Sequence, residues 1–398
     1  METFRFEELV GSKDVFFSEY FNRKPLLRRG AVRDRVRELI SIRQLDDVIT
    51  LETVHPSYVR VAKDGKGVPQ KAYTRTVPNR GAALAEAMVP EKVYELFRSG
   101  ATITWNSVNH FLPSVRLLLD GITSTFACHG EVVAFLTPAR RDGYAPHHDP
   151  VDVFVVQIEG TKSWRVWDTP EDRKGDQATF GAGELGEPAL EVTLHPGDVL
   201  YMPYNTPHAA AAQDEVSLHL SVTVEPRRWR DLLRETVDVL VEDPRYDGFP
   251  HLDDGLSPHL TRELAAKLEM LWDQLTAVAP AAEARRLAQS GRRLSGTGLP
   301  REFERLSLAD ALAPGTALRR SAAEVSFTGS DGAKTGLLVN GHRIAVPDAI
   351  ATVLRELETG APVAASRIFP GASEDRSLRA AQGLARLGVL EAADSTRS

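Results

Sequence analysis

Two β-type stretches of this sequence carry metal-binding side chains, and their histidines lie 61 positions apart. The first stretch, GYAPHHDPVDVFVVQIEGTKSWRVW, places His147 and Asp149 before a long apolar and β-branched run. The second, LHPGDVLYMPYNTPHAAAA, carries His208 directly after a turn-rich segment. The intervening chain has room for four or five short strands, and only a curled β-structure would bring the two stretches together. The spacing therefore predicts an all-β jelly roll.

Local patterns place these side chains on strands. In the first stretch we expect two consecutive strands joined by a turn at residues 159–160. Side chains alternate along a strand, so His147 and Asp149 point to one face and His148 to the other. In the second stretch we expect a turn at 196–198, a short strand at 199–202 and another turn at 205–207, so that His208 opens the next strand.

Two imidazoles and one carboxylate on one side of a metal leave its other positions open, as a chelating co-substrate and O2 require. A His-x-Asp motif alone is weak, because 11 His and 55 Asp+Glu give about one by chance. The prediction that His147, Asp149 and His208 bind Fe(II) therefore rests on the turn and strand context around them. The alternative is that these histidines have only structural roles in turns and strands and bind no metal. His219, in VSLHLSV, either lines the site or packs within a strand.

These segments, with SLHLSV after them and FFSEYFNRKPLLRRGA near the N-terminus, resemble the JmjC-type ribosomal oxygenases, also called the cupin-4 group. The resemblance covers about residues 10–225. It implies iron ligation by His147, Asp149 and His208. It also implies a 2-oxoglutarate-dependent dioxygenase that uses O2 to hydroxylate a protein side chain, an arginine or histidine of a ribosomal protein, releasing succinate and CO2.

The same resemblance implies how 2-oxoglutarate is held. Lys162, in EGTKSWRVW, matches the lysine that pairs with the distal carboxylate, and Ser221 matches a hydroxyl residue that bonds the same carboxylate. A surface lysine and a backbone-bonded strand serine are the structural alternatives. The sequence departs from the family twice. Phe135 stands where many relatives have a co-substrate-binding tyrosine, and His148 replaces the tyrosine common between the two ligands.

Other functions stay open at this point. The same chemistry could act on a small molecule or a natural-product peptide, because loops rather than the metal ligands choose the substrate. A metal-binding cupin that senses or scaffolds without turnover is a different class, and a histone demethylase is a further alternative. The segment from residue 168 to 188 is either a lid over the site or a solvated connector.

Composition sets further bounds. The 398 residues, 42% hydrophobic, suffice for two or three domains with cores of their own. A net charge of −7 argues against a general nucleic-acid binder. The single cysteine, Cys128, excludes an internal disulfide framework, suits a reducing cytoplasm and is expected in the core. We see no signal peptide and no apolar run long enough to span a membrane.

The pattern changes after residue 225. Apolar residues at helical spacing run from Trp229 to Val241 and from Leu264 to Leu275, separated by a break at 244–258. They predict a helical domain at 226–300, beside the catalytic domain at 1–225, in which we expect helices to flank the jelly roll. The corresponding region dimerises the resembled family, so we expect a homodimer; the alternative is that these helices pack on their own barrel.

Residues 301–398 alternate strands and helices, with a hairpin signal at Asn340-Gly341. This α+β pattern resembles the winged-helix-like C-terminal domain of the same family. Its helix carries Arg355, Glu356 and Glu358. Because these charges have mixed signs, the domain is expected to contact a peptide or serve as a scaffold rather than to bind duplex nucleic acid.

Overall fold

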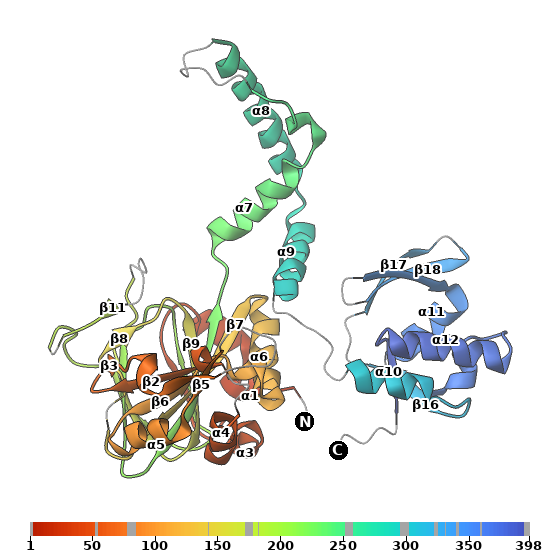
Figure 1. Cartoon of the computed structure of the whole chain (residues 1–398). Coiled ribbons are helices and arrows are strands. Elements are labelled where there is room, and N and C mark those ends of the chain that lie inside the picture. Colours follow the sequence, from red (N-terminus) through yellow and green to blue (C-terminus); the bar gives the residue numbers. More distant parts are fainter. Residues whose placement is uncertain are drawn as a thin grey trace. The chain divides into compact units, whose positions relative to one another are not determined.

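The computed structural model describes residues 3–51, 55–77, 85–141, 143–171, 178–181, 183–250, 258–294, 302–321, 325–330, 332–339, 342–358 and 360–393. Internal contacts divide the chain into two compact units, residues 1–296 and 297–398 (Figure 1). The metal-binding stretches and the helices of residues 226–296 belong to the first unit.

Two antiparallel sheets form the body of the first unit. The strands of the larger sheet are β1 (Leu26–Arg28), β2 (Val59–Lys63), β3 (Lys66–Gly67), β6 (Thr102–Trp105), β7 (His129–Thr137), β9 (Asp152–Glu159), β13 (Val199–Met202) and β15 (Ser217–Glu225). Those of the smaller sheet are β8 (His147–His148), β10 (Lys162–Val166), β11 (Ala178–Thr179), β12 (Leu190–Leu194) and β14 (His208–Ala212). The spatial orders are β1-β13-β9-β15-β7-β6-β2-β3 and β11-β8-β14-β10-β12. A further hairpin pairs β4 (Thr74–Val77) with β5 (Ala85–Met88).

Strand β9 shows why the sheets stack. Val153 and Val155 belong to a core cluster with Trp164 from the smaller sheet, whereas Phe154 and Val156 belong to the larger core on the other face. Both faces of β9 are buried, which explains its uninterrupted apolar run. The prediction of a β-rich domain with flanking helices is confirmed.

The turn between β9 and β10 lies where the sequence places it. Gly160 has φ +62°, and a Cβ there would lie 2.0 Å from the carbonyl oxygen of Val216. Only glycine fits both this backbone conformation and this close approach. The turn returns the chain from the larger sheet to the smaller one, so β10 begins at Lys162.

Helices cover the outer face of the larger sheet. They are α1 (Phe6–Val10), α2 (Lys13–Val15), a π-helix at Phe16–Tyr20, α3 (Val36–Leu39), α4 (Ile42–Ile49), α5 (Pro90–Arg98) and α6 (Pro113–Phe126). Helix α4 begins at a capping box of Ser41 and Gln44, and α6 begins with Pro113 in its first turn. Cys128 is fully buried in this core, as predicted.

The N-terminal segment is joined to the barrel through one carboxylate. Strand β1 pairs with β13, and the buried Asp198 accepts hydrogen bonds from the Gly30 amide at 2.7 Å and the Arg29 guanidinium at 2.7 Å. Burial opposes the charge of Asp198, but the amides of His195 and Gly30 and the Arg29 guanidinium outweigh it and lower the pKa. The segment preceding the barrel is therefore part of its sheet.

Three helices follow the barrel: α7 (Trp229–Leu240), α8 (Pro258–Ala277) and α9 (Pro280–Leu294). The first two match the sequence prediction, and α9 was not predicted. Helix α7 contacts both α8 and α9 (Figure 1). Residues 251–257 of the predicted break lie outside the described residues.

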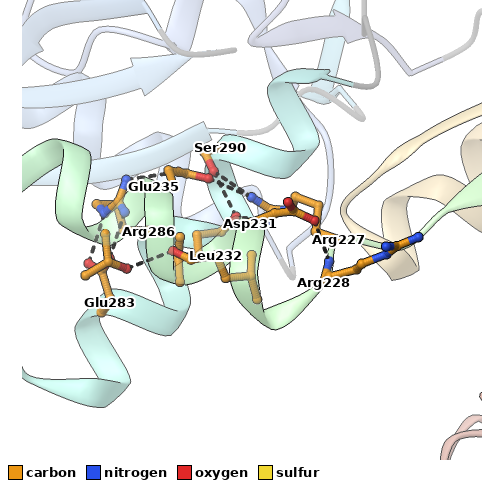
Figure 2. Close-up of polar contacts among 10 residues, drawn as sticks. Arg227, Arg228, Asp231, Leu232, Glu235, Glu283, Arg286 and Ser290 are labelled. Atoms are coloured by element: carbon orange, nitrogen blue, oxygen red, sulfur yellow. Dashed lines mark hydrogen bonds and ion pairs between the residues drawn. The ribbon is translucent and has the colours of Figure 1, made fainter. Parts of the chain in front are cut away.

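Ion pairs hold α7 against α9 (Figure 2). The Glu235 carboxylate accepts hydrogen bonds from Arg227 and Arg286, each at 3.0 Å. Arg286 also donates to Glu283, whose carboxylate accepts from Thr236 at 2.7 Å. The guanidinium of Arg227 continues to Ser290 on α9 at 3.1 Å. Charged and polar side chains therefore link this helix pair.

The second unit has its own apolar core, which includes Leu318, Leu337, Ile350, Leu384 and Val389. Its helices are α10 (Glu302–Asp310), α11 (Asp348–Glu356) and α12 (Glu374–Arg386). Its strands are β16 (Ala317–Arg320), β17 (Val325–Ser330), β18 (Lys334–Val339), β19 (His342–Pro347), β20 (Val363–Ala364) and β21 (Leu390–Ala392). The sheets run β17-β18-β19 and β20-β16-β21. The predicted turn at 340–341 lies outside the described residues.

Candidate metal centre

Strands β8 and β14 bring the two distant stretches together. They are antiparallel neighbours, with His147 directly opposite His208, and Asp149 follows β8. One ligand atom from each of these three residues lies within 4.8 Å of the others. The Nε2 atoms of His147 and His208 lie 3.6 Å and 3.8 Å from Asp149 Oδ2. Strands β9 to β13 occupy the chain between the two stretches, as the spacing suggested.

Backbone carbonyls orient both imidazoles. Nδ1 of His147 lies 2.7 Å from the carbonyl oxygen of Ala145, and Nδ1 of His208 lies 3.0 Å from that of Thr206. A carbonyl only accepts hydrogen bonds, so each Nδ1 carries the proton and each Nε2 keeps its lone pair. Burial, reinforced by His147, lowers the pKa of His208 to about 4. The free lone pairs face Asp149, which is the arrangement a metal ion needs.

The donor set fits Fe(II). Two neutral imidazole nitrogens and one carboxylate oxygen are the facial set of non-haem iron sites, and they leave the remaining octahedral positions to other ligands. His148 takes the opposite direction, as strand alternation predicts. Its ring lies 5.5 Å from that of Phe180, and it lines a different cavity.

A cavity of about 370 Å³ opens over the three residues. Among the residues that line it are the three candidate ligands and Phe135, Lys162, Trp164, His219 and Ser221. Its size is within the range of small-molecule sites. Every site residue predicted from the sequence therefore lies at this one cavity.

Lys162 is a buried cation at this cavity. Its side chain is 2% exposed, and its Nζ donates to Thr137 Oγ1 at 3.0 Å. No acidic side chain among the described residues pairs with it. Burial lowers the pKa of Lys162 to about 7. An unpaired ammonium in an apolar wall is costly, so the site fits an anionic partner.

Comparison with known proteins agrees with this geometry. The family described as "JmjC domain" matches residues 107–232. Ribosomal oxygenase 1 of Rattus norvegicus is 29% identical over 236 residues, which are 58% of this chain and 38% of that protein. The bifunctional lysine-specific demethylase and histidyl-hydroxylase NO66 of Dictyostelium discoideum is 33% identical over 214 residues, which are 48% of this chain and 41% of that protein. The chain thus spans less than half the length of these curated relatives.

A solved structure extends the likeness beyond the JmjC domain. That of YcfD, a ribosomal oxygenase from Escherichia coli, covers 99% of this chain and 100% of its own at a TM-score of 0.54 and 19% identity. Residues 107–232 form a JmjC domain, and the chain is similar to ribosomal oxygenases in sequence and in fold. A structure of YcfD in complex with cobalt and 2-oxoglutarate has a TM-score of 0.51, covers 96% of this chain and 99% of its own, and is 18% identical.

Phe135, one of the two departures from the pattern of the ribosomal oxygenases, lies beside His219, whereas His148, the other, lines a different cavity. Phe135 stacks on His219, with ring centroids 4.9 Å apart and planes 2° from parallel. His219 is buried and its Nδ1 has no hydrogen-bond partner among the described residues. Ser221 lies two residues further along β15 and lines the cavity. Where a tyrosine would offer a hydroxyl, this chain presents an aromatic stack.

Sequence reasoning missed several polar residues at this cavity. Thr102 Oγ1 donates to Thr137 Oγ1 at 3.3 Å, which extends the Lys162 contact to a second hydroxyl. Thr104 Oγ1 lies 3.3 Å from the hydroxyl of Tyr144. The available signal was the alternation of threonines in the apolar segment ATITW.

No described helix is long and apolar enough to cross a membrane.

Proposed function

We propose that this chain is a Fe(II)- and 2-oxoglutarate-dependent oxygenase that hydroxylates a protein side chain and releases succinate and CO2. The observation that carries the proposal is one cavity containing both the iron-type donor set and the ammonium of Lys162, which pairs with no carboxylate among the described residues. A metal-binding sensor would need the first feature alone. The second feature supports an anionic co-substrate.

The residues divide the work as follows. His147, Asp149 and His208 would hold the iron, and Lys162 would bind the distal carboxylate of 2-oxoglutarate, with Ser221 donating to the same group. Together, iron and 2-oxoglutarate supply the oxidising chemistry that O2 alone lacks. Burial of the cavity wall keeps water from the reacting atoms.

Thr137 is a positioning residue in this proposal. It holds Lys162 Nζ and is itself bonded by Thr102, and both threonines are buried. The short chain of hydroxyls fixes the ammonium toward the cavity. The protein needs no general base, because the chain's own groups bind and orient rather than transfer protons.

A ribosomal protein is the proposed substrate, with arginine or histidine as the target residue. The support is the similarity to proteins known as ribosomal oxygenase 1 and histidyl-hydroxylase NO66. Cytoplasmic localisation belongs to the same proposal, since the buried Cys128 suits a reducing compartment.

The test of the activity is succinate release from 2-oxoglutarate with Fe(II) and O2, with ribosomal proteins added. We expect release from the wild type and background levels from Asp149→Ala, which removes one ligand. Equal rates from the two proteins would refute the activity. Intact masses of ribosomal proteins from cells with and without the gene test the substrate, and the expected difference is one oxygen atom.

We further propose a homodimer formed through the helices after the barrel. Apolar side chains of α7 and α8 are exposed: Trp229 78%, Leu233 59%, Leu264 54%, Leu268 57% and Trp272 66%. Leu264, Leu268 and Trp272 repeat every four residues and so share one face of α8. Packing on the protein's own barrel would have covered them. A second copy would bury such a face.

Sedimentation equilibrium distinguishes the two states. Leu268→Glu places a charge in the proposed interface, so we expect the dimer to dissociate. Glu269→Lys alters the neighbouring position of the same helix and should stay dimeric. A monomeric wild type would refute the dimer.

The proposed organisation has three parts: a catalytic domain at 1–225, a dimerisation domain at 226–300 and a winged-helix-like domain at 301–398. The role proposed for the last is protein contact. The Arg355 guanidinium lies 4.4 Å from the centroid of the Phe327 ring, and Glu358 pairs with Arg320 at 3.3 Å. These charges are engaged within the unit, which argues against their use on a duplex.

A further inference from the structure

A second cavity lies on the other side of the metal-bearing strand. Its volume is about 430 Å³. His147 lines the first cavity and the adjacent His148 lines the second, because alternate side chains of β8 point to opposite faces. The residues of its lining that bear on its chemistry are His148, Trp167, Asp168, Phe180, Glu187 and Asn205.

Asn205 is the buried polar group of this cavity. It is 1% exposed, and neither its side-chain oxygen nor its nitrogen has a hydrogen-bond partner among the described residues. Its backbone amide is used, because it donates to the Asp149 carbonyl at 2.9 Å. An unsatisfied buried amide is costly, so the side chain is suited to a ligand. One acceptor beside one donor matches a peptide group.

Two carboxylates lie at the same cavity. Asp168 and Glu187 are exposed, and neither has an ion-pair partner among the described residues. The guanidinium of Arg165 lies 5.8 Å from the centroid of the Trp167 ring and brings a positive charge to this wall. Among the described residues at this cavity, the two carboxylates outnumber that guanidinium, so their net charge is negative. The cavity therefore attracts a cation.

The aromatic side chains in the cavity wall favour a planar cation. Trp167 is buried and its Nε1 donates to the Gly186 carbonyl at 3.0 Å, which fixes the ring, and Phe180 lies beside His148. A planar guanidinium stacks on aromatic rings and bonds carboxylates, so it uses both features at once. A metal ion is a poorer fit. In the described part of the chain, the residues lining this cavity supply no group of three close ligands.

We propose that this cavity binds an arginine-bearing segment of the polypeptide substrate. The guanidinium would lie between the aromatic walls and the carboxylates of Asp168 and Glu187, and a peptide group of the segment would pair with the Asn205 amide. The inference rests on the proposed function for its occupant, since it assigns the segment to the protein that is hydroxylated. The shared strand β8 places this contact beside the metal centre.

The test measures binding of a fluorescent Gly-Arg-Gly-Arg-Gly peptide to the full-length protein by anisotropy. The matched ligand carries citrulline, which keeps the shape and removes the charge. We expect the citrulline peptide to bind about 10-fold more weakly. The double variant Asp168→Asn, Glu187→Gln should weaken the arginine peptide by a similar factor. Its effect on the citrulline peptide should be small.

Two further variants sharpen the assignment. Asn205→Gly keeps the left-handed backbone, φ +60°, and removes the amide, so both peptides should weaken together. Glu215→Gln removes an exposed carboxylate elsewhere and should change neither affinity by more than about 2-fold. Thermal unfolding confirms that each variant is folded.

Equal affinity of the wild type for the two peptides would overturn the inference. So would a loss of arginine-peptide affinity in Glu215→Gln as large as that in the double variant Asp168→Asn, Glu187→Gln. The comparison of the two peptides on the wild-type protein remains valid even if a variant fails to fold. Succinate release by the wild type, measured with no peptide, separates this outcome from failure of the proposed function. If the wild type releases succinate but binds both peptides equally, the protein is an oxygenase without this subsite. If it prefers the arginine peptide but releases no succinate, the peptide site exists on a protein that is not an oxygenase.

Discussion

At the scale of single residues, Lys162 is the most informative position, because its surroundings oppose its charge. Its Nζ meets a threonine hydroxyl rather than a carboxylate, and burial lowers its pKa to about 7. Burying a lysine ammonium costs hydration free energy, so a lysine in a buried wall of a cavity indicates a functional role. Two predictions follow from that balance.

The affinity for 2-oxoglutarate should depend on pH through Lys162. The distal carboxylate binds the protonated ammonium, so below the free pKa of about 7 the affinity should be constant. Above it, binding must take up a proton, and the affinity should fall by about tenfold per pH unit until the pKa of the complex is reached. Calorimetry with Mn(II) in place of iron measures the affinity, and buffers of different ionisation enthalpy reveal the proton. Ser221→Ala should bind more weakly with the same profile, whereas a flat wild-type profile would contradict the role of Lys162.

Replacing the same lysine should separate stability from function. Lys162→Met fills similar volume without a buried charge, so we expect the free protein to become more stable by about 1 kcal/mol or more. Binding of 2-oxoglutarate should be lost. Urea unfolding and calorimetry give the two values, and Lys66→Met, at an exposed position, serves as the control that changes neither. A destabilised Lys162→Met protein would mean that the lysine is a structural group.

At the scale of elements, turns determine how the site is assembled. Gly160 ends β9 at a point where a Cβ would meet the Val216 carbonyl at 2.0 Å, while Gly65 has φ +74° with nothing within 4 Å of its Cβ position. Gly160→Ala should therefore cost about 2–4 kcal/mol, from backbone strain plus displacement of Val216 just before β15. Gly65→Ala should cost only the strain, about 1 kcal/mol. Equal losses in urea unfolding would show that the close approach contributes nothing.

Sequence patterns predicted the elements that carry a strong periodic or turn signal. Strands β9, β10, β13 and β14 lie where alternation and the Pro, Gly and Asn turns place them. Helix α9 was missed because its sequence, PAAEARRLAQSGRRL, contains only two large apolar residues, Leu287 and Leu294. Its contacts with the rest of the unit include Arg286, which donates to Glu235 on α7, and Ser290, which accepts from Arg227 just before α7. Such pairings cannot be seen in a local window.

Polar neighbours brought together by strand pairing were also beyond the sequence. Thr102 lies on β6, Thr137 on β7 and Lys162 on β10, and only the folded barrel makes them one hydrogen-bonded group. Asn205 was correctly expected in a turn. That its amide would lie buried and unpaired beside a cavity depends on strands β8 and β11, which no local pattern relates to it.

At the scale of the whole molecule, the chain consists of two units with separate cores. The barrel core includes Phe16, Phe154 and Leu220, whereas that of residues 297–398 includes Leu337 and Leu384. Each core is closed within its own unit. Units of this kind fold independently when no large apolar surface joins them.

A fragment of residues 1–296 should therefore fold and keep the metal centre, since every lining residue of the first cavity lies within it. We expect its 2-oxoglutarate affinity to stay within about twofold of the full chain and its α7 and α8 faces to sustain the same oligomeric state. Calorimetric unfolding of the full chain should show two transitions, one of which coincides with that of the fragment. The fragment of residues 297–398 supplies the other transition as the matched control. A single cooperative transition that neither fragment reproduces would show that the two cores stabilise each other, and the C-terminal unit would then belong to the structural support of the metal centre.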